Sequence, residues 1–192
     1  MYSNNALKKM VYLTFNLHSK TLITILLFLF VSVGCSTPKR YVPDPTSAKN
    51  SAGHFVINTT VDVINAQAST KVHKLDFNNL EVTYKDYTQA LVDALESELV
   101  RSGAGLSRSA EKILKVAVKE VYLTGTANTY VGYMLVEVEM GNGKIESFES
   151  SRQSLRSGFN IGLFPTKPLD VAFVDLVASI FENKNIKFYL SN

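Results

Sequence analysis

The sequence predicts a two-layer α+β domain in which a mainly antiparallel four-stranded sheet carries two helices on one face, behind an N-terminal leader. Four segments alternate apolar and polar residues with the period of a strand, and two segments place apolar residues at helical spacing. Their order is strand, helix, strand, strand, strand, helix, which is typical of α+β architectures. The 192 residues suffice for one ordinary domain and a targeting segment.

Period-two alternation defines the four expected strands. The first begins at His54 and continues through Val63, where Phe55, Ile57 and Val61 share one face. The second and third are longer, and Gly141-Asn142-Gly143 suits a hairpin turn after the third. The second, third and fourth strands are expected over Lys112 to Leu123, Thr129 to Met140, and Lys144 to Gln153.

Two amphipathic helices are expected to cover the sheet. Thr83 can cap the first, with Asp86 three residues later, and Ser102-Gly103 supplies its end. Pro168 stands near the start of the second. The apolar residues that recur at helical spacing are Tyr87, Leu91, Ala94, Leu95 and Leu99 in the first helix, and Leu169, Phe173, Leu176, Val177, Ile180 and Phe181 in the second.

The formal charge of +3 belongs to the leader. Lys8, Lys9 and Lys20 precede residue 35, and residues 1–34 contain no Asp or Glu, so the chain from Cys35 onward is neutral. Nucleic-acid binding needs a basic stripe on the folded domain, so no nucleic-acid partner is expected. A single cysteine excludes an internal disulfide and a Cys-x-x-Cys pair.

Residues 1–34 have the features of a secretory signal. Thr21 to Val33 is a 13-residue apolar run, shorter than the roughly 20 residues that span a bilayer, and Lys20 precedes it. Translation from Met10 instead of Met1 would give a leader of more ordinary length.

Ser32-Val33-Gly34-Cys35 resembles the bacterial lipobox, although Ser32 stands where Leu is usual. The resemblance implies that Cys35 receives a covalent lipid and becomes the first residue of the mature chain. Several acyl chains would bind the membrane stably. The competing interpretation, a small buried core cysteine, is disfavoured because a linker follows Cys35. Ser36 is not the Asp that retains many such proteins in the inner membrane, which favours the outer membrane.

Three parts of the chain are expected. Residues 1–34 form the signal peptide, and residues 35–53, with Pro38, Pro43 and Pro45, form the lipidated Cys and its tether. Residues 54–192 form the periplasmic domain.

Four segments together resemble the YajG-type family of small Gram-negative outer-membrane lipoproteins: "ALVDALESELVRSGAG", "ILKVAVKEVYL", "GNGKIESFESSRQSLRSGF" and "PLDVAFVDLVASIF". The likeness covers about Leu91 to Leu190 plus the lipobox. It implies a periplasm-facing accessory protein with an α+β domain. No catalytic residue is implied by the family.

No motif for catalysis or for a metal stands out, and no cofactor is expected beyond the lipid on Cys35. His54 and His73 are far apart and lack further ligands at a recognisable spacing. Glu137 and Glu139 are expected on a solvated strand face, since general acid catalysis needs burial. The sequence therefore favours a non-enzymatic protein.

The apolar loop before the last helix is the best candidate for contact with another envelope protein. Phe159, Ile161, Leu163 and Phe164 lie there, either tucked over the sheet edge or exposed as a contact patch. Two alternatives stay open: a groove between sheet and helices that binds a lipid or glycan, and an uncatalogued hydrolase. An enclosed apolar cavity would favour the former, and convergent ionisable side chains in a cleft the latter.

Overall fold

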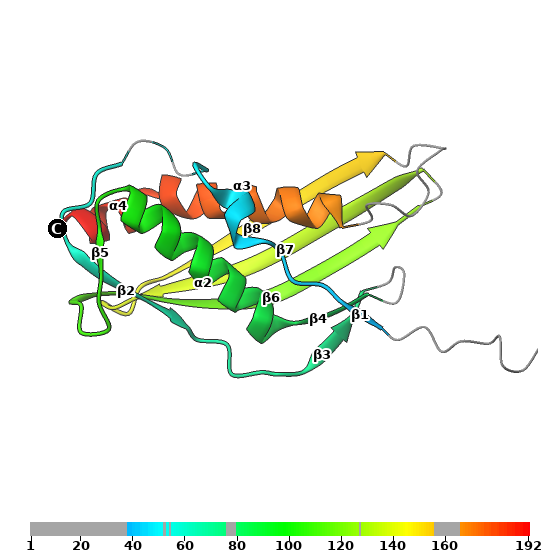
Figure 1. Cartoon of the computed structure of the whole chain (residues 1–192), viewed down its shortest axis with the longest axis horizontal. Coiled ribbons are helices and arrows are strands. Elements are labelled where there is room, and N and C mark those ends of the chain that lie inside the picture. The colour runs from blue at the N-terminus through cyan, green and yellow to red at the C-terminus, as the bar shows by residue number, and fades with distance from the viewer. Residues whose placement is uncertain (1–37, 52, 54, 76–79, 127, 156–165) are drawn as a thin grey trace, which may run out of the picture. The chain divides into compact units, whose positions relative to one another are not determined.

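The computed structural model describes residues 38–192 apart from 52, 54, 76–79, 127 and 156–165. The described residues form two β-sheets, of three and five strands, with three α-helices and one 3-10 helix (Figure 1). The expected single four-stranded, mainly antiparallel sheet with two helices is therefore wrong, although the class is α+β. The elements are β1 Lys39–Arg40, η1 Pro45–Ala48, β2 Thr60–Asn65, β3 Val72–Lys74, β4 Leu80–Thr83, α2 Tyr84–Arg101, β5 Gly105–Leu106, β6 Lys112–Gly125, β7 Thr129–Met140, β8 Ile145–Leu155, α3 Lys167–Glu182 and α4 Lys184–Ser191.

The larger sheet has the strand order β5-β2-β6-β7-β8. Strands β6, β7 and β8 form an antiparallel meander, whereas β2 is parallel to both β5 and β6. Parallel neighbours need a crossover, and the chain supplies it between β2 and β6 with α2. The three long strands correspond to expected ones, and the alternation of β7 is regular: Tyr130, Met134, Val136, Val138 and Met140 are buried.

The second sheet, in the order β1-β4-β3, has no counterpart in the expected fold. Its strands have two to four residues, too few for a period-two pattern to be distinguished from chance. β1 is held by pairing with a distant segment: Lys39 lies opposite Leu80, and the Tyr41 N–H donates to the Glu81 carbonyl over 2.8 Å. Such pairing depends on the tertiary fold and not on local sequence.

Both expected helices are present with the expected signals. Thr83 Oγ1 accepts the Asp86 N–H over 3.2 Å at the start of α2, and Gly103 adopts a φ of +94° after its end. Pro168 lies in the first turn of α3. Asn183 caps a further helix, α4, by accepting the N–H groups of Asn185 and Ile186. No helix in the described part of the chain is both long and apolar enough to cross a membrane.

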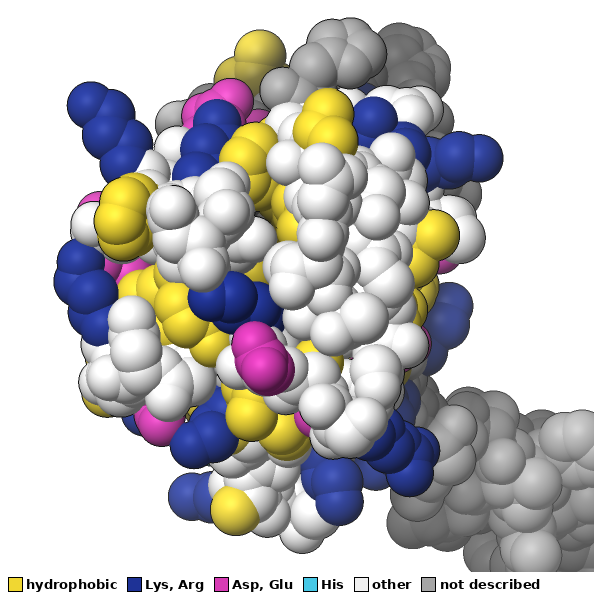
Figure 2. All heavy atoms as spheres, turned by 90° about the vertical axis from the view of Figure 1, so that its left-hand side faces the viewer, with side chains coloured by type: hydrophobic (Ala, Val, Ile, Leu, Met, Phe, Trp, Pro, Cys, Tyr) yellow, Lys and Arg dark blue, Asp and Glu magenta, His cyan; other side chains and the backbone are white. Residues whose placement is uncertain are grey.

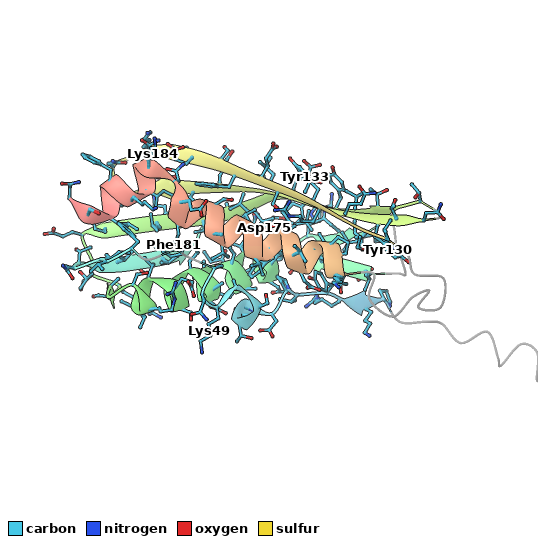
Figure 3. The ribbon with its side chains drawn as sticks, turned by 90° about the horizontal axis from the view of Figure 1, so that it is seen from above. Lys49, Tyr130, Tyr133, Asp175, Phe181 and Lys184 are labelled. Atoms are coloured by element: carbon cyan, nitrogen blue, oxygen red, sulfur yellow. The ribbon has the colours of Figure 1, made fainter. Side chains whose placement is uncertain are left out.

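Helices α2 and α3 lie side by side on one face of the larger sheet (Figure 3). Their apolar stripes are buried against alternate residues of β6 and β7, and Tyr87, Leu95, Phe173 and Leu176 are fully buried there. The opposite face carries side chains of intermediate burial such as Tyr133, which stacks on Tyr122 with ring centroids 4.7 Å apart. No described helix covers that second face.

Gly132 of β7 permits the close approach of α3 to the sheet. A Cβ at this position would lie 2.7 Å from the Leu169 nitrogen and 2.8 Å from the Pro168 carbonyl carbon. Real Cβ atoms do not approach backbone so closely, so any larger residue would displace the first turn of α3.

Side chains satisfy the backbone of β6 where the shorter strand β2 ends. The last residue of β2 pairs with Val116, and β6 continues to a register shift between Val118 and Glu120. Thr88 Oγ1, which is fully buried on α2, accepts the Val118 N–H over 3.1 Å, and the Gln67 side chain donates to the Val118 carbonyl. These contacts replace the missing strand bonds, as buried backbone groups require.

Replacing Thr88 with Val is expected to destabilise the domain by about 1–3 kcal/mol, because a buried N–H of β6 loses its acceptor while the side-chain volume stays similar. Urea unfolding followed by circular dichroism measures this change. Thr88→Ser retains the hydroxyl and serves as the control. Equal stabilities of Thr88→Val and Thr88→Ser would contradict the assigned role of the hydrogen bond.

Candidate functional site

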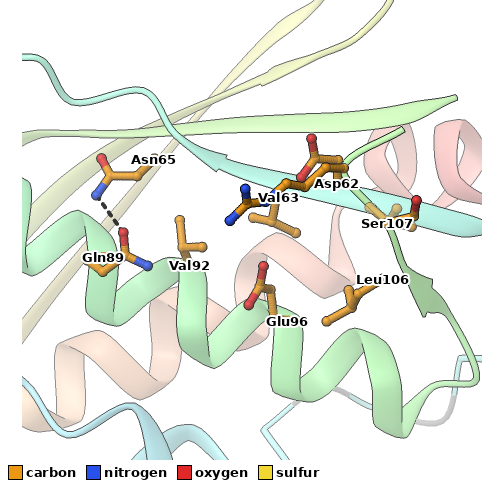
Figure 4. Close-up of a pocket in the computed structure, with 10 residues that line it drawn as sticks. Asp62, Val63, Asn65, Gln89, Val92, Glu96, Leu106 and Ser107 are labelled. Atoms are coloured by element: carbon orange, nitrogen blue, oxygen red, sulfur yellow. Dashed lines mark hydrogen bonds between the residues drawn. The ribbon is translucent and has the colours of Figure 1, made fainter. Parts of the chain in front are cut away.

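A groove of about 430 Å³ lies where the edge of β2 meets α2 and the chain that follows β5 (Figure 4). The apolar side chains Val61, Val63 and Val92 are themselves buried and line its base. The remaining lining is contributed by Asp62 and Asn65 of β2, Gln89 and Glu96 of α2, and Leu106, Ser107 and Arg108. The groove thus combines three elements that are separate in sequence.

Most of the exposed lining is polar. The Asn65 side chain donates both to the Lys85 carbonyl and to Gln89 Oε1, each over 3.1 Å. Gln89 Nε2 in turn donates to Asp93 over 2.9 Å. This chain of amides holds one end of the groove in place, while Glu96 projects toward its centre (Figure 4).

The part of the β2 edge that lies beyond β5, with which no described segment pairs, also faces the groove. Strand β5 pairs only with Thr60 and Val61 of β2. On this side of β2 the carbonyls of Thr59 and Val61 accept the N–H groups of Gly105 and Ser107. Backbone groups alternate in direction along a strand, so the N–H and C=O of Val63 point the same way. The groove therefore presents backbone donors and acceptors as well as side chains.

The electrostatic environment of Glu96 is unfavourable for its charged form. Partial burial raises the pKa of this carboxyl above its ordinary value, and the nearby carboxylates of Asp93 and Asp62 raise it further. A hydrogen-bond donor or a cationic group placed in the groove would relieve this repulsion.

The lining of the groove includes ionisable side chains and the hydroxyl of Ser107. Its hydroxyl, Ser107 Oγ, lies 3.0 Å from Ser109 Oγ and accepts the Ser109 N–H, so it is held by its own turn. A hydrolytic nucleophile needs a general base within hydrogen-bond reach. No hydrogen bond from Ser107 to a carboxylate or histidine occurs in the described residues.

Residues 38–51, which were expected to belong to the tether, pack against α2 and α3. The Tyr41 hydroxyl donates to Asp170 Oδ1 at the start of α3, and the Tyr41 ring lies 6.1 Å from that of Tyr87. Burial is the main cause of a raised pKa for both tyrosines, and the carboxylate of Asp170 adds to it. Both phenols therefore stay neutral.

The rest of this segment is also fixed. Helix η1 contacts both α2 and α3, and its Ala48 is fully buried. The Asn50 N–H donates over 2.8 Å to Glu98, a buried carboxylate that is also paired with Arg101 at 2.6 Å. Residues from Pro38 onward accordingly belong to the same compact unit as the domain.

The expected site residues mostly fall outside the described part of the chain. This holds for the lipobox Ser32, Val33 and Gly34 with Cys35, and for the loop residues Phe159, Ile161, Leu163 and Phe164. Those assignments stay predictions.

Of the remaining candidates, Glu137, Glu139 and His73 lie in the described part of the chain, whereas His54 lies outside it. Glu137 and Glu139 form surface ion pairs with Lys119 and Lys115, at 2.7 and 2.9 Å, so the solvated face is confirmed. His73 stacks on Tyr84 with ring centroids 4.0 Å apart. Among the described residues no group of His, Cys, Asp and Glu could hold a metal ion.

Basic side chains do not gather into a stripe at the end of the domain that α4 and β5 form. Figure 2 shows Lys and Arg spread over this face, with acidic and hydrophobic side chains between them. This distribution agrees with the neutral charge of the chain after residue 34.

The chain is only distantly similar to the known proteins with which it was compared. No protein-family model matches the chain, and no curated protein matches it. A minor lipoprotein from Acinetobacter baumannii aligns with 12% identity and a TM-score of 0.45, covering 69% of this chain and 93% of that one. The hypothetical protein CT253 from Chlamydia trachomatis aligns with 11% identity and a TM-score of 0.41, covering 69% and 98%. These values transfer neither a function nor a fold assignment, and membership of the YajG-type family stays a prediction.

Replacing Tyr41 with Phe is expected to loosen residues 38–51, because Asp170 then loses a donor in a half-buried position. Trypsin cleavage after Arg40 and Lys49 should become several-fold faster, since proteases cut transiently opened segments. Tyr122→Phe, a change on the uncovered sheet face, is the matched control. Unchanged cleavage in Tyr41→Phe would show that the hydrogen bond does not hold the segment.

Proposed function

We propose that this chain is a non-enzymatic lipoprotein of the bacterial envelope that is anchored to a membrane through acylated Cys35. The observation that carries the proposal is the apolar run Thr21 to Val33 followed directly by Gly34-Cys35. A thiol at this position is readily alkylated through its thiolate. Two or three acyl chains would bind the bilayer far more stably than one.

The docking of residues 38–51 determines what such an anchor would do. Lys39 of β1 is the fourth residue after Cys35, and a fully extended chain advances at most about 3.6 Å per residue. The acylated cysteine would then lie within about 14 Å of β1. The domain would be held close to the membrane surface with a restricted orientation, instead of on a long free tether.

The destination proposed is the outer membrane, with the domain facing the periplasm. Ser36 supports this choice, since an Asp at that position favours retention in the inner membrane. The partner proposed is another envelope protein, and no nucleic acid. The absence of an assembled nucleophile and base in the described groove supports a binding role over hydrolysis.

Intact mass and membrane fractionation of the wild type and of Cys35→Ser test the anchor. The wild type is expected to lose residues 1–34, to gain the mass of its acyl chains and to sediment with the outer membrane. Cys35→Ser should lack the added mass and leave the membrane fraction, since the thiol is the attachment point. An unacylated, soluble wild-type protein would contradict the proposal.

A second candidate function is the binding of a glycan in the groove of Figure 4. The specific observation in its favour is the polar lining, in which Asp62, Glu96 and Arg108 stand beside side-chain amides. Carboxylates and amides bind sugar hydroxyls in pairs, whereas a lipid chain needs an enclosed apolar cavity. The groove therefore supports a glycan over a lipid.

Titration calorimetry with chitotetraose tests glycan binding on the detergent-solubilised full chain. Glu96→Gln is expected to weaken binding about tenfold, since it removes one charge-assisted hydrogen bond. Glu182→Gln, an exposed change on α3, should leave binding unchanged. Absence of heat with the wild type, or equal weakening by both variants, would exclude the groove as a glycan site.

A further inference from the structure

Strand β8 is the outermost strand of the larger sheet at the end opposite to β5. It pairs with β7 over its whole length, from Ile145 opposite Glu139 to Leu155 opposite Thr129, without a register shift. No described segment pairs with its other edge. Figure 3 views the sheet from the side of this edge. In this view β8 runs beside α3, the helix that carries Asp175, and α3 does not lie over β8.

The backbone groups that face this edge can be identified. The Met140 N–H donates to the Lys144 carbonyl over 2.8 Å, so this pair exchanges bonds between β7 and the chain entering β8. Bonded and non-bonded pairs alternate in an antiparallel ladder. The even-numbered residues of β8 therefore bond to β7, and the odd-numbered residues from Ile145 to Leu155 direct their N–H and C=O groups outward.

The edge carries three charged side chains, Glu146, Glu149 and Arg152, but it lacks the other features in its own sequence that normally prevent strand pairing. Natural sheets protect long edges with lysine, proline or a bulge. The β8 sequence IESFESSRQSL contains no lysine or proline, and its register is continuous. Its one basic residue, Arg152, is paired with Asp175 of α3. An edge of 11 residues without such protection is a template for another strand.

The sequence of β8 is complementary to itself in one antiparallel register. A two-fold axis at Ser150 places Ile145 opposite Leu155 of a second copy, and Ser147 opposite Gln153. Ile145 and Leu155 are 56% and 80% exposed, and this register lets each cover the other. In this register each odd-numbered residue of one copy lies opposite an odd-numbered residue of the other. The outward-facing N–H and C=O groups of the two strands can therefore all form hydrogen bonds with each other.

Charge distinguishes this register from its neighbours. With the axis at Ser150, Glu149 faces Ser151, Glu146 faces Ser154, and no like charges lie directly opposite. Arg152 lies diagonal to Glu146 of the second copy, which is a favourable pair, whereas the two Glu149 side chains lie diagonal to each other, which is an unfavourable one. A shift of two residues in one direction places Glu149 opposite Glu149, and a shift in the other leaves Ile145 without its apolar partner.

From these observations we infer that two copies of this chain associate through β8, forming a continuous ten-stranded sheet about a two-fold axis at Ser150. This inference goes beyond the proposed function and is independent of the groove. The occupant of the edge is a second copy because one register pairs the exposed apolar ends Ile145 and Leu155 and places no like charges directly opposite each other.

Disulfide cross-linking in whole cells tests the register with the full chain. The double variant Ser147→Cys/Gln153→Cys places thiols opposite each other, at the roughly 5.5 Å Cα separation of a bonded pair, which a disulfide can span. Each single variant leaves its own two thiols about 20 Å apart along the strands. Oxidation should give at least about tenfold more dimer from the double variant than from either single variant.

The wild-type chain, oxidised in parallel, measures any background from Cys35. Equal dimer yields from single and double variants would indicate random collision and overturn the inference. A cross-linked product with the mass of a different protein would assign the edge to another partner and overturn it equally. All the substituted positions are exposed, so the fold is expected to be retained.

Ser151→Pro, combined with the double variant, tests the backbone contacts. Ser151 directs its N–H outward, so proline removes two symmetry-related bonds of the dimer and none to β7. The dimer should weaken about thirtyfold, while Ser151→Ala should retain it. Unchanged cross-linking in the proline variant, with an unchanged circular dichroism spectrum, would show that β8 does not pair through its edge.

Discussion

The contact between the Tyr41 hydroxyl and Asp170 joins two parts of the chain that are 129 residues apart. It fixes the segment of residues 38–51 to the first turn of α3, which itself lies against Gly132 of the sheet. Around it, β1 pairs with β4, and the Asn50 N–H is held by the buried carboxylate of Glu98. The N-terminal segment is thereby part of the folded unit, and this constraint determines how an acylated Cys35 would present the domain.

Much of the larger sheet and both long helices could be predicted from the sequence. The reason is that β7 and α2 have a single buried face each, so the burial of Met134 or Leu95 is visible in the spacing of apolar residues. The strands β1, β3, β4 and β5 could not be predicted, because two to four residues carry no period and their pairing is decided by distant backbone. The Pro-rich composition of residues 36–53 predicted a tether. Tyr41 was the sequence signal for packing in this segment, because its aromatic ring can be buried against the domain.

The groove could not be predicted for a similar reason. Asp62, Glu96 and Arg108 come from β2, from α2 and from the chain after β5, and the packing of α2 on β2 and the pairing of β5 with β2 place them together. A sequence pattern shows which face a residue occupies within one element but not which element lies opposite. The solvated position of Glu137 and Glu139 was predictable, since both lie on one regular strand.

The two surfaces proposed for binding lie toward opposite edges of one sheet. The groove uses the edge of β2 beyond its short pairing with β5, and the dimer contact uses the edge of β8. In both places no described segment pairs with the backbone of the sheet edge, and neither surface involves residues 38–51. A chain anchored through Cys35, as proposed, could therefore bind a ligand and a second copy without releasing residues 38–51.

Native-state hydrogen exchange at the Tyr41 amide tests most directly whether this segment is part of the fold. This amide donates to the Glu81 carbonyl and belongs to the segment closest to the proposed anchor. The account predicts protection of the same order as that of the α2 amides, since opening it requires release of η1 and of the Tyr41 ring from the core. Exchange at the rate of an unstructured peptide would contradict the account, because residues 38–51 would then form a free tether.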